Sequence, residues 1–249
     1  MEGERAVDVL KLYPDFPGAA EMLDCYDLFA KKSIWIIGGD GWAYDIGFAG
    51  LDHVLAENVD INILVMDTEC YSNTGGQTSK ATPLGSTAKY SYDGKRTFKK
   101  DLGRMMMTYG YVYVASIALG ANYLQSLQAF EEADAYQGPS IVIAYCPCIL
   151  HGIRAGMSHS IVEEKLAVKA GYWPLYRYNP MNEKKGEKAL TVDYIKPDNS
   201  LPEYLDGEDR YADLKLRDPE EAAILRPELQ QRCDNLYDVM TYEAGAPNL

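Results

Sequence analysis

The chain has 249 residues, a net charge of −13 and a hydrophobic content of 47%. This length and composition predict one globular domain with a full core and a terminal appendage. The acidic balance argues against nucleic acid as a partner, because nucleic acid selects basic faces. No apolar stretch approaches the roughly 18 residues of a membrane span, and the first residues lack a signal-peptide pattern. A cytoplasmic location is therefore expected.

The apolar runs predict a regular alternation of strands and helices. Ser33–Gly38 and Asn62–Asp67 are short apolar runs typical of buried strands, and Asp45–Glu57 between them has helical spacing. Thr68–Phe98 has no clear period, and a loop of that length in a compact domain is usually functional. The alternation then resumes, as helix, strand, helix, strand, helix and strand, at Lys100–Tyr109, Val112–Ile117, Asn122–Tyr136, Ser140–Tyr145, Ile161–Ala170 and Leu175–Tyr178.

This order predicts an α/β fold: a doubly wound, mostly parallel sheet with helices on both faces. The composition changes after Pro180, with a charged stretch, a segment rich in Pro, Asp and Gly, and a helical pattern over Pro219–Tyr242. We therefore expect an α/β domain over 1–180. Residues 181–249 are expected to form an extended arm and a terminal helix, packed on that domain or on a partner.

Two polar segments follow the first two predicted strands. Gly39-Asp40-Gly41-Trp42 offers a carboxylate between glycines, and Thr68–Gly76 offers a hydroxyl, an amide and exposed backbone. Because the carboxyl ends of parallel strands form the binding edge of such a sheet, both segments should meet there. Oxygen ligands suit Mg²⁺, and Gly lets the backbone approach a diphosphate. The first segment alone is equally typical of a turn or a helix cap.

The two segments together resemble the metal–diphosphate motif of thiamine-diphosphate enzymes. Most of those enzymes carry Asn at the later position, whereas this chain has Asp67-Thr68. DTECYSNTGGQTSKATP, which begins at Asp67, and KLAVKAGYWPLYRYNP (Lys165–Pro180) closely resemble pyruvate:ferredoxin (flavodoxin) oxidoreductases. The likeness runs from about Ser33 to Pro180 and continues more weakly through LDGEDRY (Leu205–Tyr211).

The resemblance implies the same thiamine-diphosphate-binding fold and a role for each matching residue. Asp40 would give a carboxylate oxygen to Mg²⁺, Thr68 its hydroxyl and Cys70 its backbone carbonyl. Asn73 would be catalytic, with its amide towards the substrate or the intermediate, and Cys148 would bind an iron–sulfur cluster. The residues that would line the cofactor are Gly39, Asp40, Gly41, Trp42, Thr68, Glu69, Cys70, Tyr71, Ser72 and Asn73.

Each of these roles has a structural alternative. Thr68 could cap a turn, Asn73 could hold the loop, and Cys148 could be a plain buried thiol. The side chains of Cys70 and Cys146 are expected to be incidental.

The remaining cysteines and histidines carry weaker expectations. The five cysteines include no C-x-x-C pair, so neither a disulfide framework nor a Cys₄ site is expected within this chain. Cys25 and Cys233 are expected to be structural or surface residues. His53 is expected to serve packing, whereas His151 and His159 could border the site.

The resemblance further implies oxidative decarboxylation of pyruvate to acetyl-CoA and CO₂, with thiamine diphosphate, Mg²⁺ and a [4Fe–4S] cluster shared with residues outside this chain. Electrons would pass to ferredoxin or flavodoxin. The pyrimidine-binding and ferredoxin-like parts are not found, so the chain is expected to be inactive alone and to belong to a larger, homo-oligomeric enzyme. A non-catalytic or vestigial cofactor-binding fragment, and an oxidoreductase for another 2-oxo acid, remain alternatives.

Overall fold

The computed structural model describes residues 2–29 and 32–245, and the chain forms two compact units that divide between Ile34 and Trp35. The first unit contains helices α1 (Glu2–Leu12) and α2 (Ala19–Asp24) and a 3₁₀ turn, η1 (Tyr26–Phe29). No helix among the described residues is long and apolar enough to cross a membrane. The boundary between the units lies far from the one expected at 180/181, because residues after 180 share the core of the second unit.

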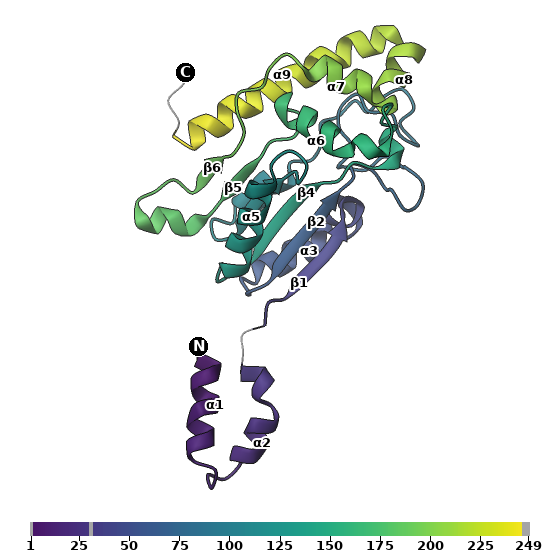
Figure 1. Ribbon diagram of the computed structural model, residues 1–249. Helices are drawn as coiled ribbons and strands as arrows, with labels where there is room; N and C mark the ends of the chain where they lie inside the picture. Colours follow the sequence, from purple (N-terminus) through teal and green to yellow (C-terminus); the bar gives the residue numbers. More distant parts are fainter. Residues whose placement is uncertain (1, 30–31, 246–249) are drawn as a thin grey trace. The chain divides into compact units, whose positions relative to one another are not determined.

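The second unit is built on a six-stranded sheet in the order β1-β2-β4-β3-β5-β6 (Figure 1). The strands are β1 (Trp35–Gly39), β2 (Asn62–Asp67), β3 (Tyr113–Ile117), β4 (Ser140–Tyr145), β5 (Tyr176–Tyr178) and β6 (Leu190–Val192). β1 to β4 are mutually parallel, and β5 and β6 are antiparallel additions at one edge. The continuous apolar runs of β3 and β4 are buried on both faces, as expected for parallel strands under helices.

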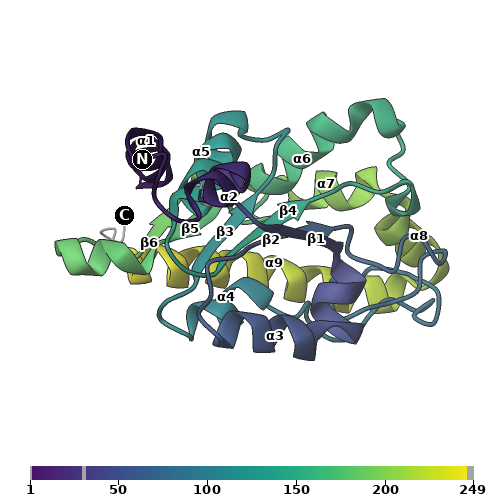
Figure 2. The ribbon, with the colours of Figure 1, turned by 90° about the horizontal axis from the view of Figure 1, so that it is seen from below.

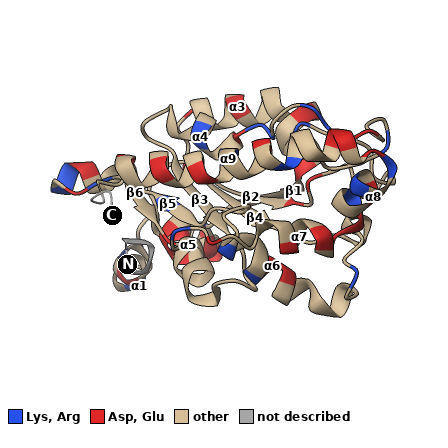
Figure 3. Ribbon diagram, turned by 90° about the horizontal axis from the view of Figure 1, so that it is seen from above, with Lys and Arg blue, Asp and Glu red and all other residues tan. Residues whose placement is uncertain are grey.

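Helices cover both faces of this sheet (Figures 2 and 3). One face carries α3 (Phe48–Ala56), α4 (Leu102–Met107) and the long α9 (Pro219–Glu243), and the other carries α5 (Tyr123–Ala135) and α6 (Ser160–Lys169). The acidic residues are spread over the outer helices of both faces, which accords with a solubilising acidic surface (Figure 3). The doubly wound α/β fold predicted from the sequence is confirmed.

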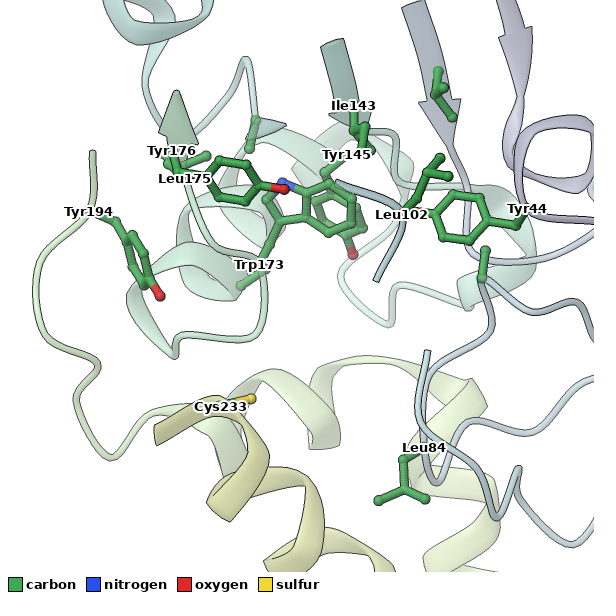
Figure 4. Close-up of a cluster of buried hydrophobic side chains, with 14 of the residues drawn as sticks. Tyr44, Leu84, Leu102, Ile143, Tyr145, Trp173, Leu175, Tyr176, Tyr194 and Cys233 are labelled. Carbon is green, nitrogen blue, oxygen red and sulfur yellow. The ribbon is translucent and has the colours of Figure 1, made fainter. Parts of the chain in front are cut away.

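The larger of two hydrophobic clusters lies on the α9 face and includes Tyr44, Leu102, Trp173 and Cys233 (Figure 4). Trp173 stacks on Tyr145 with ring centroids 4.8 Å apart. The smaller cluster joins α5 to β3 and β4 through Tyr113, Ala129 and Val142, among others. Residues from the tail therefore complete the core that the sheet begins.

Two predicted segments differ from the structure. The helix expected over Asp45–Glu57 is divided at Gly47 into a π-helix, η2 (Gly41–Ile46), and α3. The extended arm is shorter than expected, because Leu190–Val192 joins the sheet and two helices, α7 (Leu201–Gly207) and α8 (Asp209–Arg217), precede α9. Leu201, Tyr204 and Leu205 are buried, so hydrophobic burial orders a segment whose local composition is typical of a loop.

Short 3₁₀ turns complete the second unit. They are η3 (Ile149–His151), η4 (Met157–His159) and η5 (Pro180–Lys185). η3 follows β4 directly and brings His151 back towards the end of β2, where its ring contacts the Thr68 carbonyl. Thr68–Phe98 remains irregular, as predicted, apart from isolated bridges such as Tyr71 with Gln77.

Candidate metal and diphosphate site

Adjacent parallel strands bring Asp40 and Thr68 together. Gly39 lies opposite Met66 in the register of β1 and β2, so the residues that follow each strand leave the same edge of the sheet. Thr68 donates to Asp40 Oδ1 twice, from its backbone nitrogen at 3.1 Å and from Oγ1 at 2.8 Å. The two segments singled out in the sequence therefore form one site.

Thr68 Oγ1 also joins the carbonyl oxygen of Cys70, 3.2 Å away, to this group. The three oxygens expected to bind the cation are therefore grouped together, with those of Asp40 and Cys70 both next to the Thr68 hydroxyl. Ser72 Oγ contacts the same hydroxyl, and Ser79 Oγ lies 3.5 Å from Asp40 Oδ2. An all-oxygen set with a single carboxylate suits Mg²⁺, which usually binds through one or two carboxylates and the phosphates of its ligand.

The electrostatics of Asp40 favour a bound cation. Asp40 is 1% exposed. Burial, followed by the negative charge of Asp67, raises the pKa of Asp40 to about 7. A cation at this carboxylate would offset both effects, since an opposite charge stabilises the ionised form.

Glycines let aromatic rings close over the first segment. A Cβ at Gly41 would lie 2.5 Å from Cδ1 of Tyr71, so Gly41 leaves the space in which that ring packs. Similarly, the ring of Trp42 occupies the space that side chains at Gly38 and Gly47 would take. Gly39 has open space at the same position. The glycines beside Asp40 thus serve both close backbone approach and ring packing.

The second segment turns sharply after Cys70. Gly75 and Gly76 have φ of 109° and 88°, values that favour glycine, and the Gly76 N–H donates to the Tyr71 carbonyl at 2.8 Å. Asn73, at the outer end of this turn, has an exposed side chain. Its position leaves the amide accessible to a ligand, and its catalytic role stays a prediction.

Glu69, between the two expected ligands Thr68 and Cys70, has a left-handed backbone with φ of 60°. Its side chain is 1% exposed and points into a buried ion-pair network, with Lys99 Nζ 2.9 Å from Oε1 and Arg210 Nη1 2.7 Å from Oε2. Although burial opposes ionisation, the charges of Lys99 and Arg210 lower the pKa of Glu69 to about 2. Glu69 can therefore face a cofactor only with its backbone.

The network continues on both sides of Glu69. Lys99 Nζ lies 2.7 Å from Asp67 Oδ2, and Arg210 Nε donates to Glu208 Oε2 at 2.7 Å. Lys99 also lies over the ring of Trp173, 4.6 Å from its centroid. Lys99, Glu208 and Arg210 were not among the site residues predicted from the sequence. The one available signal was the weak likeness through LDGEDRY, which contains both tail residues.

His151 lies beside the candidate site, in agreement with the expectation that it could border the site. Its Nε2 is 2.8 Å from the carbonyl oxygen of Thr68, and its Nδ1 is 3.5 Å from Glu208 Oε1. His159 is exposed and contacts its neighbour Ser158. His53 was expected to serve packing but is exposed on α3, 3.9 Å from Glu57.

The cysteines divide by exposure. Cys70 and Cys146 lie at this edge of the sheet, and burial is the main factor that raises the pKa of each thiol to about 12. Cys148 is half-buried, and the Leu150 N–H lies 3.5 Å from its sulfur. Cys25 is exposed, whereas Cys233 is a buried residue of α9. No group of three or more His, Cys, Asp or Glu side chains that could hold a metal gathers among the described residues.

Two cavities border Glu69 from opposite sides. One, of about 570 Å³, is lined by Cys70, Gly76, His151 and Arg210 among others. The other, of about 830 Å³, lies between the sheet and α9, with Trp173 and Tyr176 in one wall and Cys233 in the other (Figure 4). Both open to solvent and neither is lined by Asp40, so the candidate metal site is a crowded edge rather than a deep pocket.

Comparison with known proteins identifies the class. The profile of the family "Thiamine pyrophosphate enzyme, C-terminal TPP binding domain" matches residues 18–144, and the chain belongs to this family. The match includes both metal-site segments and strands β1 to β3.

The relatives of the chain are 2-oxo-acid oxidoreductases by name. It is 58% identical over 199 residues to the "Pyruvate:ferredoxin oxidoreductase" of Moorella thermoacetica, covering 80% of this chain and 17% of that protein. It is 48% identical over 231 residues to the "Probable pyruvate-flavodoxin oxidoreductase" of Escherichia coli, covering 93% of this chain and 20% of that one. The chain thus spans a fifth or less of the length of these two curated relatives.

A solved 2-oxoglutarate:ferredoxin oxidoreductase from Magnetococcus marinus, with 2-oxoglutarate, coenzyme A and succinyl-CoA bound, aligns at 27% sequence identity. The TM-score is 0.42, and the alignment covers 45% of this chain and 39% of that chain.

Proposed function

We propose that this chain is the thiamine-diphosphate- and Mg²⁺-binding portion of a pyruvate:ferredoxin or pyruvate:flavodoxin oxidoreductase. The complete enzyme would convert pyruvate and coenzyme A to acetyl-CoA and CO₂, and pass two electrons through iron–sulfur clusters to the carrier protein. The proposal rests on the convergence of Asp40 Oδ1, Thr68 Oγ1 and the Cys70 carbonyl at one edge of the sheet. The names of the relatives support the substrate and the carriers.

The residues of this chain would bind and orient the cofactor. Asp40, Thr68 and Cys70 would hold Mg²⁺, and the backbone around Gly41 and Thr68 would approach the diphosphate. When bound, thiamine diphosphate supplies the carbanion-stabilising chemistry, and the protein supplies position and electrostatics. Asn73, exposed at the outer end of the turn, would donate its amide to negative charge that develops on the substrate.

Cys148 is proposed as one ligand of a [4Fe–4S] cluster. Its half-buried sulfur can reach a group outside this chain, whereas the thiols of Cys70 and Cys146 are held in their protonated forms by burial. The other ligands would come from missing parts of the enzyme. The pyrimidine-binding and ferredoxin-like parts, the homo-oligomeric state and a cytoplasmic location stay predictions.

The test is calorimetric titration of the 249-residue chain with thiamine diphosphate, with and without Mg²⁺. We expect Mg²⁺-dependent binding. Asp40→Asn should weaken it by more than about 100-fold, because losing a metal ligand should cost more than losing a residue that only orients a ligand. Asp45→Asn is the matched control, because Asp45 lies in the π-helix that directly follows Asp40 but faces Lys80, 3.2 Å away. Unchanged affinity in Asp40→Asn would show that the carboxylate does not hold the metal.

A further inference from the structure

The backbone between Thr68 and Cys70, which carries oxygens of the candidate metal site, is held by residues far away in the sequence. Glu69 separates Thr68 from Cys70, and its left-handed φ of 60° is what turns the chain so that the Cys70 carbonyl faces Thr68 Oγ1. A left-handed conformation is unfavourable for a residue with a Cβ and persists only where surrounding contacts enforce it. Those contacts are made by the Glu69 side chain.

Arg210 makes the longest-range of these contacts. Its Nη1 donates to Glu69 Oε2 at 2.7 Å, its Nε to Glu208 at 2.7 Å, and its Nη2 to the Tyr204 hydroxyl at 3.0 Å. Arg210 is 5% exposed and Glu208 is 0% exposed. The planar guanidinium therefore links Glu69 to the helical tail with three of its N–H groups, in a geometry that Lys cannot reproduce.

The backbone around Arg210 is fixed independently of Glu69. The Thr87 N–H and hydroxyl both donate to the Arg210 carbonyl, at 2.8 and 2.9 Å. The Asp209 N–H donates to the Gly152 carbonyl at 2.9 Å, and the Arg154 N–H donates to the Gly207 carbonyl at 2.9 Å. The segment that carries Glu208 and Arg210 is thus a rigid support and not a mobile end.

We propose that Arg210, itself seated by Glu208, is a positioning residue: it holds Glu69 in its left-handed conformation and so presents the Thr68 and Cys70 oxygens to the metal ion. His151 supports the same loop by contacting the Thr68 carbonyl while facing Glu208. The identity of the ion rests on the function proposed above. The consequence is that the metal site is completed by α8, beyond residue 144, where the family match ends.

Hydrogen exchange of the cofactor-free chain tests the loop directly. We expect Arg210→Met to accelerate amide exchange over residues 68–77 about tenfold or more, because a buried ion pair is broken beside it, with little change in α5. Arg226→Met is the matched control. Arg226 lies in the same tail and pairs with Asp206 at 2.7 Å. Equal exchange of the loop in the two variants would overturn the proposal.

Titration with Mg²⁺ and thiamine diphosphate provides the second readout. Arg210→Met should weaken binding by about 10- to 100-fold, as loss of a residue behind a metal ligand does, whereas Arg226→Met should not. Arg210→Lys should recover only part of the affinity, because one ammonium cannot hold Glu69 and Glu208 in the same geometry. Full recovery would show that charge alone suffices and would overturn the geometric role.

Failure of the proposed function and failure of the proposed role of Arg210 give different results. A wild-type chain that binds no thiamine diphosphate refutes the proposed function, while the exchange experiment still decides the role of Arg210. If Arg210→Met does not fold, the charge-balanced Arg210→Met/Glu208→Gln variant replaces it. That variant leaves Lys99 as the partner of Glu69 and should show the same faster exchange of the loop.

Discussion

The two segments proposed to provide the metal-binding oxygens are held in different ways. The segment after β1 is fixed by rings that pack on its glycines, with Tyr71 over Gly41 and Trp42 against Gly38 and Gly47. The segment after β2 is fixed by buried charges, with Glu69 between Lys99 and Arg210. The first arrangement depends on rings from the two site segments themselves, whereas the second depends on a helix 141 residues away.

This difference has a physical origin. Packing of a ring on a glycine is short-ranged, and both rings come from the two site segments, so the β1 segment needs no contact from the tail. Buried ion pairs recover the cost of desolvation only where good geometry is imposed from outside. The β2 segment therefore requires the complete second unit, including α7 and α8.

The largest expected effect separates the two kinds of ligand within the β2 segment. Thr68→Val removes one hydroxyl at nearly constant volume and should weaken Mg²⁺-dependent binding of thiamine diphosphate about 10- to 100-fold. Cys70→Ala keeps the backbone carbonyl, so it should change the affinity less than about threefold. A difference of that size is well under 1.4 kcal/mol. Titration calorimetry measures both. A larger loss in Cys70→Ala than in Thr68→Val would show that the thiol contributes to binding.

The next effect tests the ring packing of the β1 segment. Gly41→Ala places a Cβ 2.5 Å from Cδ1 of Tyr71, and overpacking of this kind typically costs about 1–3 kcal/mol. Gly39→Ala meets nothing within 4 Å and is the matched control. Chemical denaturation should give a lower free energy of unfolding for Gly41→Ala only. Equal losses in both variants would mean that the Tyr71 ring does not restrict this position.

The smallest expected effect is a pH-dependent change in stability, caused by a buried carboxyl close to Glu208. Burial, followed by the charge of Glu208, raises the pKa of Glu163 from 4.5 to about 7. The protonated folded form therefore contributes stability below pH 4.5, and this contribution is lost as the pH rises through 7. Glu163→Gln lacks that loss, so it should be more stable than the wild type at pH 8 by an amount of order 1 kcal/mol, and the gap should close at pH 5.

Thermal unfolding at pH 5 and pH 8 measures this difference. Glu131→Gln, on the exposed side of α5, is the control. A gap for Glu163→Gln that stays constant between the two pH values would contradict the assignment of Glu163 as a buried, mainly neutral carboxyl.

The sequence pattern was enough to predict the parallel strands and to place the candidate site at their carboxyl ends. Asn62–Asp67 and Ser140–Tyr145 were predicted with their observed bounds, because continuous apolar runs bounded by polar residues have few other structures in a protein of this size. Asp40 and Thr68 were placed at one edge since parallel neighbours end on the same side. Their oxygens could thus be grouped before any distance was known.

The contacts that hold the Asp40 and Thr68 segments in place became visible only in the tertiary structure. Lys99, Glu208 and Arg210 are ordinary surface types in sequence, and burial in a shared network is what turns them into supports of Glu69. The π-helix after Asp40 and the helices α7 and α8 were not predicted for the same reason: packing overrode local composition. Periodicity reports which residues face a core, but it does not report which charges meet across it.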